Sequence, residues 1–125
     1  MNYLSSEEIL LIHHQLIERF SGSHGVRDLN RIRSVAIAPA QEVFGKEQYI
    51  GIFNKAAVYI RNIVIDHPFI DGNKRTAISC AVMFLKKNNH IFRANLGEIE
   101  DFMVKMVVNK LEVLEIAEWL KDHSS

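Results

Sequence analysis

Few of the features that mark secreted, membrane-spanning or nucleic-acid-binding proteins occur in this sequence. Cys80 is the only cysteine, so no disulfide can form within the chain, as is typical of proteins in reducing compartments. Fifteen Lys and Arg residues balance fifteen Asp and Glu residues, and this formal charge of zero argues against a nucleic-acid partner. The longest uncharged apolar stretch, residues 76–85, is too short to span a bilayer, which takes about 20 residues.

Signals for secretion or for several domains are also missing. The first ten residues, MNYLSSEEIL, lack the basic and apolar segments of a secretory signal peptide. No repeat, low-complexity tract or linker divides the chain. Its 125 residues, 48% hydrophobic and 24% charged, suffice for one ordinary globular core. We therefore expect a cytoplasmic protein without a membrane partner, folded as a single domain over residues 1–125.

Apolar residues recur mostly at helical spacing, which predicts an all-α fold. Capping signals locate some of the ends, because Ser5 and Glu8 form a capping-box pattern and Pro39 stops the second helix. Residues 39–48 are expected to form a loop, and residues 91–94 an extended segment. The whole pattern predicts a compact six-helix bundle with helices over residues 6–20, 29–38, 49–66, 73–87, 96–108 and 112–122.

Two of the expected helices, 49–66 and 73–87, are apolar on nearly every side. A helix of this kind is normally buried in the middle of a domain. The stretch where the two helices meet, HPFIDGNKRT (residues 67–76), holds the densest polar cluster in the chain. The sequence therefore predicts a central buried helix preceded by a polar loop, which we interpret as a functional feature and not a decorative turn.

The start of the helix at residue 73 has the properties of an anion site. The first turn of a helix presents free N–H groups and a partial positive charge. Lys74 and Arg75 lie in this turn, where they oppose the helix dipole and slightly destabilise the helix. Their presence makes sense if a polyanion binds there, and phosphate is the natural candidate.

Reactive side chains precede this helix start. Histidine titrates near neutral pH, so His67 can act as a general base. Asp71 can hold Mg²⁺ when substrate phosphates and waters supply the other ligands. Asn73 can bond a phosphate oxygen or shape the loop, and Phe69 or Ile70 is expected to anchor the loop in the core. Base, carboxylate and anion site together are the parts of phosphoryl or nucleotidyl transfer.

A structural interpretation of the same residues stays open at this point. The triplet Asp-Gly-Asn at residues 71–73 is also an ordinary turn sequence. A histidine beside a proline often has only a structural role. The apolar flanks of the loop and the two bases that oppose the helix dipole favour the functional interpretation.

The polar stretch resembles the signature of the Fic/Doc family. That signature reads histidine, any residue, phenylalanine, any residue, acid, Gly or Ala, Asn, Gly or Lys, Arg. Its slots are filled here by His67, Phe69, Asp71, Gly72, Asn73, Lys74 and Arg75. The likeness continues upstream, where LSSEEILLIHHQLIERFSGSHGVRD (residues 4–28) is similar to the opening of Doc-type members. It covers about residues 3–122 and implies a short all-α body.

Two positions depart from the wider Fic pattern, in which the signature continues Gly-Arg-x-x-Arg. Lys74 replaces the glycine and Ile78 replaces the second arginine. Both departures are similar to those of Doc-type members, so the resemblance implies a protein kinase that transfers the terminal phosphate of ATP. Two alternatives stay open, namely AMP transfer by a divergent Fic protein and a non-catalytic binding module with the same fold.

The resemblance also implies a role for each matched residue. His67 would deprotonate a Ser or Thr hydroxyl of the target, and Asp71 would hold Mg²⁺. Ser79, one helical turn beyond the signature, is a further candidate for the site. The phosphates of ATP would be gripped by the first N–H groups of the helix together with Gly72, Asn73, Lys74 and Arg75.

Partners follow from the resemblance as well. The target would be a translation factor, elongation factor Tu by family likeness, and its modification would arrest translation. Many Fic proteins carry an inhibitory helix in which Glu is followed by Gly or Asn, and neither pair occurs here. The protein is thus expected to be a toxin controlled by a separate antitoxin chain, whose disordered tail folds on binding. Residues 39–54 are expected to form a flap that aligns the target peptide by strand addition.

Overall fold

The computed structural model describes all residues from 1 to 125 and is mainly helical, which confirms the all-α fold class. The six α-helices are α1 (Ser6–Phe20), α2 (Leu29–Ile37), α3 (Ile52–Asp66), α4 (Asn73–Lys87), α5 (Leu96–Val108) and α6 (Val113–Asp122). The other elements are a 3₁₀ turn, η1 (Ala38–Ala40), and an antiparallel hairpin of β1 (Glu42–Val43) and β2 (Lys46–Glu47). None of the helices combines the length and the apolarity that a membrane span requires.

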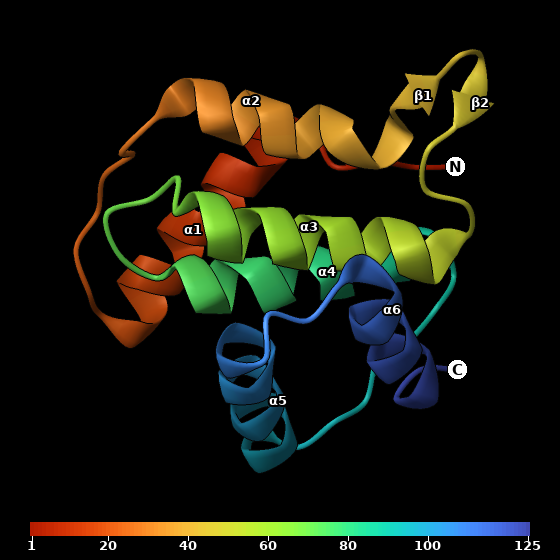
Figure 1. Ribbon diagram of the computed structural model, residues 1–125. Coiled ribbons are helices and arrows are strands. Elements are labelled where there is room, and N and C mark those ends of the chain that lie inside the picture. Colours follow the sequence, from red (N-terminus) through yellow and green to blue (C-terminus); the bar gives the residue numbers. More distant parts are fainter.

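The centre of the molecule is formed by α3 and α4, which pack against one another (Figure 1). Each is 15 residues long, and both bury most of their apolar side chains, as their composition predicts. α6 and α2 pack on α3, whereas α1 packs on α4. One cluster of 22 buried residues, drawn from all six helices, forms the core. The polar loop therefore starts and ends in buried helices.

Local signals set several helix ends as predicted. At the start of α1 the Ser5 hydroxyl accepts from the Glu8 N–H, and the Glu8 carboxylate accepts from the Ser5 N–H. α2 ends at Ile37, and Pro39 lies in the 3₁₀ turn that follows. Residues 91–94 are extended beside the C-terminus, where Phe92 forms a bridge with Ser124. These ends follow from short-range rules and needed no tertiary information.

The prediction of a helix from residue 49 is wrong by three residues, because α3 begins at Ile52. Residues 42–47 form a short hairpin, and the Gln48 N–H donates to the Gln41 carbonyl next to it. The chain then needs residues 49–51 to turn from the hairpin into α3. No side chain caps the start of α3, so the sequence carries no capping signal that separates this turn from the helix.

The hairpin and the polar loop lie at opposite ends of α3 (Figure 1). A helix of this length spans about 22 Å. Neither the hairpin nor the turn after it contributes a residue to the cavities around His67. This arrangement does not bring residues 39–54 to the polar loop, so it contradicts the expectation of a flap that adds a strand beside the site.

Candidate active site

The loop that joins α3 to α4, residues 67–72, turns sharply at His67. Pro68 disfavours helical angles at the residue before it, and His67 adopts a left-handed conformation with φ 46° and ψ 58°. Its N–H still donates to the Ile63 carbonyl and so closes the last turn of α3. The imidazole consequently sits at the end of a buried helix while remaining exposed to solvent itself.

Phe69 and Asn73 fix this loop from the inside. The Phe69 side chain is only 1% exposed and belongs to the core. The buried Asn73 carboxamide bonds both backbone groups of Phe69, since Oδ1 accepts from its N–H and Nδ2 donates to its carbonyl, each at 3.0 Å. The Asn73 side chain thus shapes the loop, which leaves its backbone N–H as the group that can meet a phosphate.

The segment between α1 and α2 runs alongside the loop. Val26 forms an antiparallel bridge with Phe69, and the Ile70 N–H donates to the Gly25 carbonyl at 3.1 Å. Two further N–H groups of this segment donate to the Pro68 carbonyl. The loop is therefore bonded on its outer side by backbone groups that lie 40 to 45 residues away in sequence.

His13 supports the loop from α1. Its ring stacks on Phe69, with ring centroids 3.8 Å apart and planes inclined by 6°. Its Nε2 lies 2.8 Å from the Asp71 carbonyl oxygen, and because a carbonyl only accepts, Nε2 carries the proton. Burial lowers the pKa of His13, which favours the neutral ring. His13 is thus a neutral donor that positions the backbone of Asp71.

The Asp71 carboxylate is exposed and held by two backbone groups. Its Oδ2 accepts from the Ser23 N–H at 3.0 Å, and its Oδ1 accepts from the Gly72 N–H at 2.8 Å. These bonds lower the pKa of Asp71, so the group is ionised at neutral pH. Gly22 lies against it, and a Cβ at that position would stand 2.7 Å from Oδ2 on a backbone with φ +130°.

The start of α4 offers donors without acceptors. The first bond within this helix runs from the Thr76 N–H to the Gly72 carbonyl at 3.0 Å, and no side chain caps the helix. The N–H groups of Asn73, Lys74 and Arg75 have no acceptor in the chain. Neither of the two basic side chains forms an ion pair. This combination of free N–H groups and unpaired cations favours an anion.

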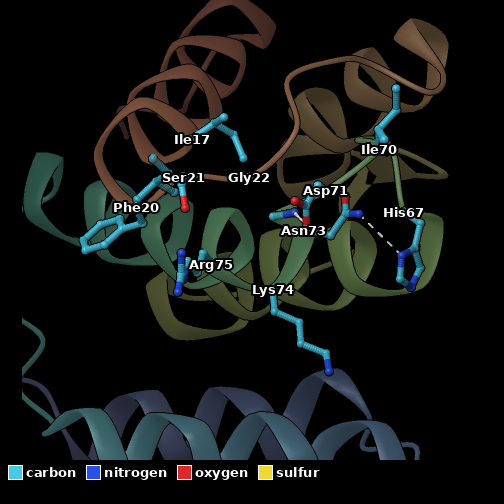
Figure 2. Close-up of a pocket in the computed structure, with 12 residues that line it drawn as sticks. Ile17, Phe20, Ser21, Gly22, His67, Ile70, Asp71, Asn73, Lys74 and Arg75 are labelled. Atoms are coloured by element: carbon cyan, nitrogen blue, oxygen red, sulfur yellow. Dashed lines mark hydrogen bonds between the residues drawn. The ribbon is translucent and has the colours of Figure 1, made fainter.

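A cavity of about 550 Å³ opens at this helix start. Its α1 wall includes Leu16, Ile17 and Phe20. Figure 2 shows the imidazole of His67 and the guanidinium of Arg75 on opposite sides of Asp71 and Asn73. The sequence-predicted residues that the structure brings together around this cavity are His67, Asp71, Gly72, Asn73, Lys74 and Arg75.

The two ends of the cavity are held by different contacts. Asn73 Nδ2 lies 3.4 Å from His67 Nδ1, and because the amide can only donate, the tautomer that matches this contact has its proton on Nε2. The contact is long for a hydrogen bond, so it restrains the ring weakly. At the other end the Arg75 guanidinium carbon lies 5.0 Å from the centroid of the Phe20 ring, a cation–π position.

Ser79 and Ile78 lie outside the His67 cavity. Both line a neighbouring apolar groove of about 510 Å³ between α1, α4 and α5. Lys74 and Arg75 line the groove as well as the cavity, whereas His67 does not line the groove. Ser79 is therefore not placed with the candidate base, and the helical turn after Arg75 contributes apolar surface where a second arginine would contribute charge.

Asp71 fits the single protein ligand of a Mg²⁺–nucleotide complex. Each carboxylate oxygen accepts one N–H bond, which leaves lone pairs on both oxygens for a cation. The carboxylate is exposed and ionised, and phosphates bound at the start of α4 would supply further oxygen ligands. The donor set is thus that of a metal held jointly with substrate and not that of a closed protein site.

Sequence reasoning missed several residues that build the site. The sequence pattern assigned no site role to His13, Gly22 or Ser23. The one available signal was that His13 lies in line with Ile9 and Ile17 on the buried face of α1. A buried imidazole needs a hydrogen-bond partner, and this pointed to a contact with another element. The backbone donors of residues 22–28 carry no side-chain signal and could not be found from the pattern.

Comparison with known proteins decides the family. The family model described as Fic/DOC matches residues 3–85, which is more than half of the chain and includes α1 to α4 up to Leu85. The chain belongs to the Fic/Doc family. It is 30% identical over 122 residues to "Protein kinase doc" of Escherichia phage P1, which covers 97% of this chain and 94% of the relative. It is also 30% identical over 100 residues to "Toxin Doc" of Mycolicibacterium smegmatis, covering 78% and 77%. The resemblance seen in the signature is thereby confirmed.

Proposed function

We propose that this protein is a Doc-type toxin that transfers the terminal phosphate of ATP to a Ser or Thr hydroxyl of a translation factor, elongation factor Tu by family likeness. The relatives named kinase and toxin support the reaction class. One structural observation carries most of the weight: the unpaired cations Lys74 and Arg75 and the free N–H groups of α4 open into the same cavity as His67.

In the proposed reaction His67 accepts the proton of the target hydroxyl. The hydroxyl oxygen bonds to the terminal phosphorus of ATP, and the bond from that phosphorus to the bridging oxygen breaks, so that ADP leaves with the electron pair. In the tautomer that matches the Asn73 contact, Nδ1 is the ring nitrogen of His67 that carries no proton. Because Nδ1 accepts from Asn73 Nδ2 in this arrangement, it must leave that 3.4 Å contact before it can accept the proton of the target hydroxyl.

The remaining residues bind and orient. The N–H groups at the start of α4 and the Lys74 ammonium bind phosphate oxygens, and the planar fork of Arg75 can bind two oxygens at once. Mg²⁺, when bound with ATP, would neutralise charge on the phosphates, and Asp71 is the residue that would hold it. His13 and the Ser23 N–H keep Asp71 in place.

Ile78 supports transfer of phosphate over transfer of AMP. Isoleucine cannot bind a phosphate, and here it lines the apolar groove beside Leu16 and Met103. The cations that face the His67 cavity from α4 are thus confined to Lys74 and Arg75. A cluster of two cations is suited to bind one part of the triphosphate chain. This is expected if the terminal phosphate is the group that reacts.

We assign the antitoxin to the apolar groove between α1, α4 and α5. The groove is lined by exposed or half-buried side chains such as Ile78, Leu96 and Val104, which suit the apolar face of a helix. Lys74 and Arg75 also line the groove, so an acidic residue of the partner would complete the fit. Val104→Glu is expected to weaken antitoxin binding while kinase activity persists; unchanged binding would contradict the assignment.

Incubation of the protein with a cell extract and labelled ATP tests the proposed function. Label on the γ-phosphate should appear in one protein band of the size of a translation factor, whereas label on the α-phosphate should not. Transfer of α-label would mean AMP transfer. No transfer of either label, together with equal growth of cells expressing wild type and His67→Asn, would favour a non-catalytic binding module.

A further inference from the structure

Three side chains that commonly bind metals meet on the surface of α1, outside the active-site cavity. His14 and Glu18 lie one turn apart on α1, and His24 lies in the segment that follows the helix. One ligand atom from each lies within 4.8 Å of those of the other two. No other group of three or more His, Cys, Asp or Glu side chains in the chain comes this close together.

The spacing of these atoms approaches that of a tetrahedral metal site. Glu18 Oε1 lies 3.2 Å from His24 Nε2 and 3.7 Å from His14 Nε2. Ligand atoms bound to Zn²⁺ at about 2.0–2.1 Å in a tetrahedron stand roughly 3.3–3.4 Å apart. The two imidazole rings are 4.9 Å apart between centroids, so small rotations would place both nitrogens on one ion.

Little in the protein competes for these side chains. They are between 47% and 63% exposed, and their polar contacts are the two histidine–glutamate pairs themselves. Surface ion pairs of this kind contribute little to stability. The three side chains are therefore free to rotate onto an ion at small energetic cost.

The position of His24 connects the cluster to the active site. The preceding residue, Ser23, donates its N–H to Asp71 Oδ2 at 3.0 Å. The following residue, Gly25, accepts from the Ile70 N–H at 3.1 Å. The backbone of the segment thus holds the loop of the active site on one side, while the His24 side chain meets α1 on the other.

We propose that His14, Glu18 and His24 bind a divalent transition-metal ion such as Zn²⁺, which clips the segment 21–25 to α1. Two imidazoles and one carboxylate are a typical donor set for Zn²⁺, with water as the fourth ligand. Mg²⁺ prefers oxygen ligands and octahedral geometry, so this site discriminates against the ion that Asp71 would hold. The clip stabilises the backbone that bonds the Asp71 carboxylate.

Calorimetric titration of the full, untagged chain with ZnCl₂ tests the site. One ion is expected to bind per chain, and MgCl₂ is expected not to compete. Changes in the shell around a metal already weaken binding by about 10- to 100-fold, so His14→Gln and His24→Gln should each cost at least about tenfold. Two matched controls, Glu7→Gln on the same helix and His90→Gln elsewhere, should keep wild-type affinity.

A variant of the active site separates this proposal from the proposed function. His67→Asn should bind Zn²⁺ as the wild type does, because His67 does not belong to the cluster. Equal affinity in wild type and His24→Gln, or loss of binding in His67→Asn, would overturn the site. Both outcomes are independent of whether the protein transfers phosphate.

Hydrogen exchange of the Ser23 amide tests the clip. Zn²⁺ should slow this exchange in the wild type, because the N–H that bonds Asp71 is held more firmly. It should not slow exchange in His24→Gln. Zn²⁺ binding without slower exchange at Ser23 would overturn the connection to the active site.

Discussion

At its C-terminal end α3 runs into a loop that is bonded from three directions, whereas at its N-terminal end it follows an exposed two-stranded hairpin. The loop is fixed by Asn73 from α4, by His13 from α1 and by the backbone of residues 22–28. On the hairpin side the buried Lys55 donates to the Pro39 carbonyl and pairs with Glu47 at 3.2 Å.

This difference separates two tasks. The proposed catalysis requires atoms held in fixed positions, and the loop at His67 would supply them through its contacts with three elements. The hairpin presents side chains to solvent, most clearly Phe44 at its tip, which is fully exposed. Substitutions that break contacts of the loop at the C-terminal end of α3 should therefore lower both activity and stability. Substitutions of exposed hairpin side chains at the N-terminal end should change neither strongly.

The largest effect is expected for His67→Asn. Asparagine tolerates the left-handed backbone of this position, so the fold should persist while the base is lost. Phosphate transfer to the target should fall by about 10²- to 10⁴-fold, the range typical of a general acid–base group. Transfer is measured with γ-labelled ATP, and nucleotide binding, measured in parallel, should remain. A variant that keeps wild-type activity would show that the loop is built around another base.

His13→Ala and Phe44→Ser compare the two ends of α3 directly. Loss of a buried stacked ring and of the bond to the Asp71 carbonyl should lower the free energy of unfolding by about 2–4 kcal/mol. Phe44→Ser should change it by no more than about 0.5 kcal/mol, because the ring is fully exposed. Urea unfolding measures both, and equal losses would contradict the contrast between the ends.

Gly22→Ala and Gly45→Ala form a second pair. Both glycines have positive φ, but only the Cβ at position 22 would meet Asp71, whereas the one at 45 meets no atom within 4 Å. Gly22→Ala should lower stability by about 1–2 kcal/mol and also reduce phosphate transfer, because Asp71 must move. Gly45→Ala should keep wild-type activity. Equal activities in the two variants would mean that the position of Asp71 is not critical.

The smallest effect is expected from His123, far from both ends in sequence. Hydrogen bonds to the Trp119 carbonyl and to Glu98 raise the pKa of His123 above its usual value near 6.5. The stabilisation that the protonated His123 ring gives to the folded protein is therefore complete below about pH 6.5. It is lost as the pH rises through the pKa of His123 in the folded state. The stability difference between wild type and His123→Gln should shrink from pH 6 to pH 9 in thermal unfolding. A difference that grows with pH would contradict this assignment.

Much of the architecture could be predicted from the sequence because it follows local rules. Apolar spacing gave the buried pair α3 and α4, and the capping box of Ser5 and Glu8 gave the start of α1. The hairpin escaped prediction because its two strands are only two residues long and exposed on both faces, so they show no alternation of buried and exposed residues.

The site was predictable where function depends on side-chain type and not where it depends on the backbone. His67, Asp71, Lys74 and Arg75 could be named from their chemistry and their place at a helix start. The donors that hold Asp71, the N–H groups of Ser23 and Gly72, have no side-chain signature. Asn73 combines both situations. Its residue type suggested a phosphate ligand, but its buried side chain bonds the backbone of Phe69 and so shapes the loop.

We propose that the cluster at the start of α4 delivers a terminal phosphate to a target hydroxyl. Intact-mass measurement of purified elongation factor Tu, incubated with ATP, Mg²⁺ and this protein, tests it most directly. The factor is expected to gain the mass of one phosphate group with the wild type and to gain no mass with His67→Asn. A gain of one AMP group, or an unchanged mass with active wild-type protein, would rule out phosphate transfer to this factor.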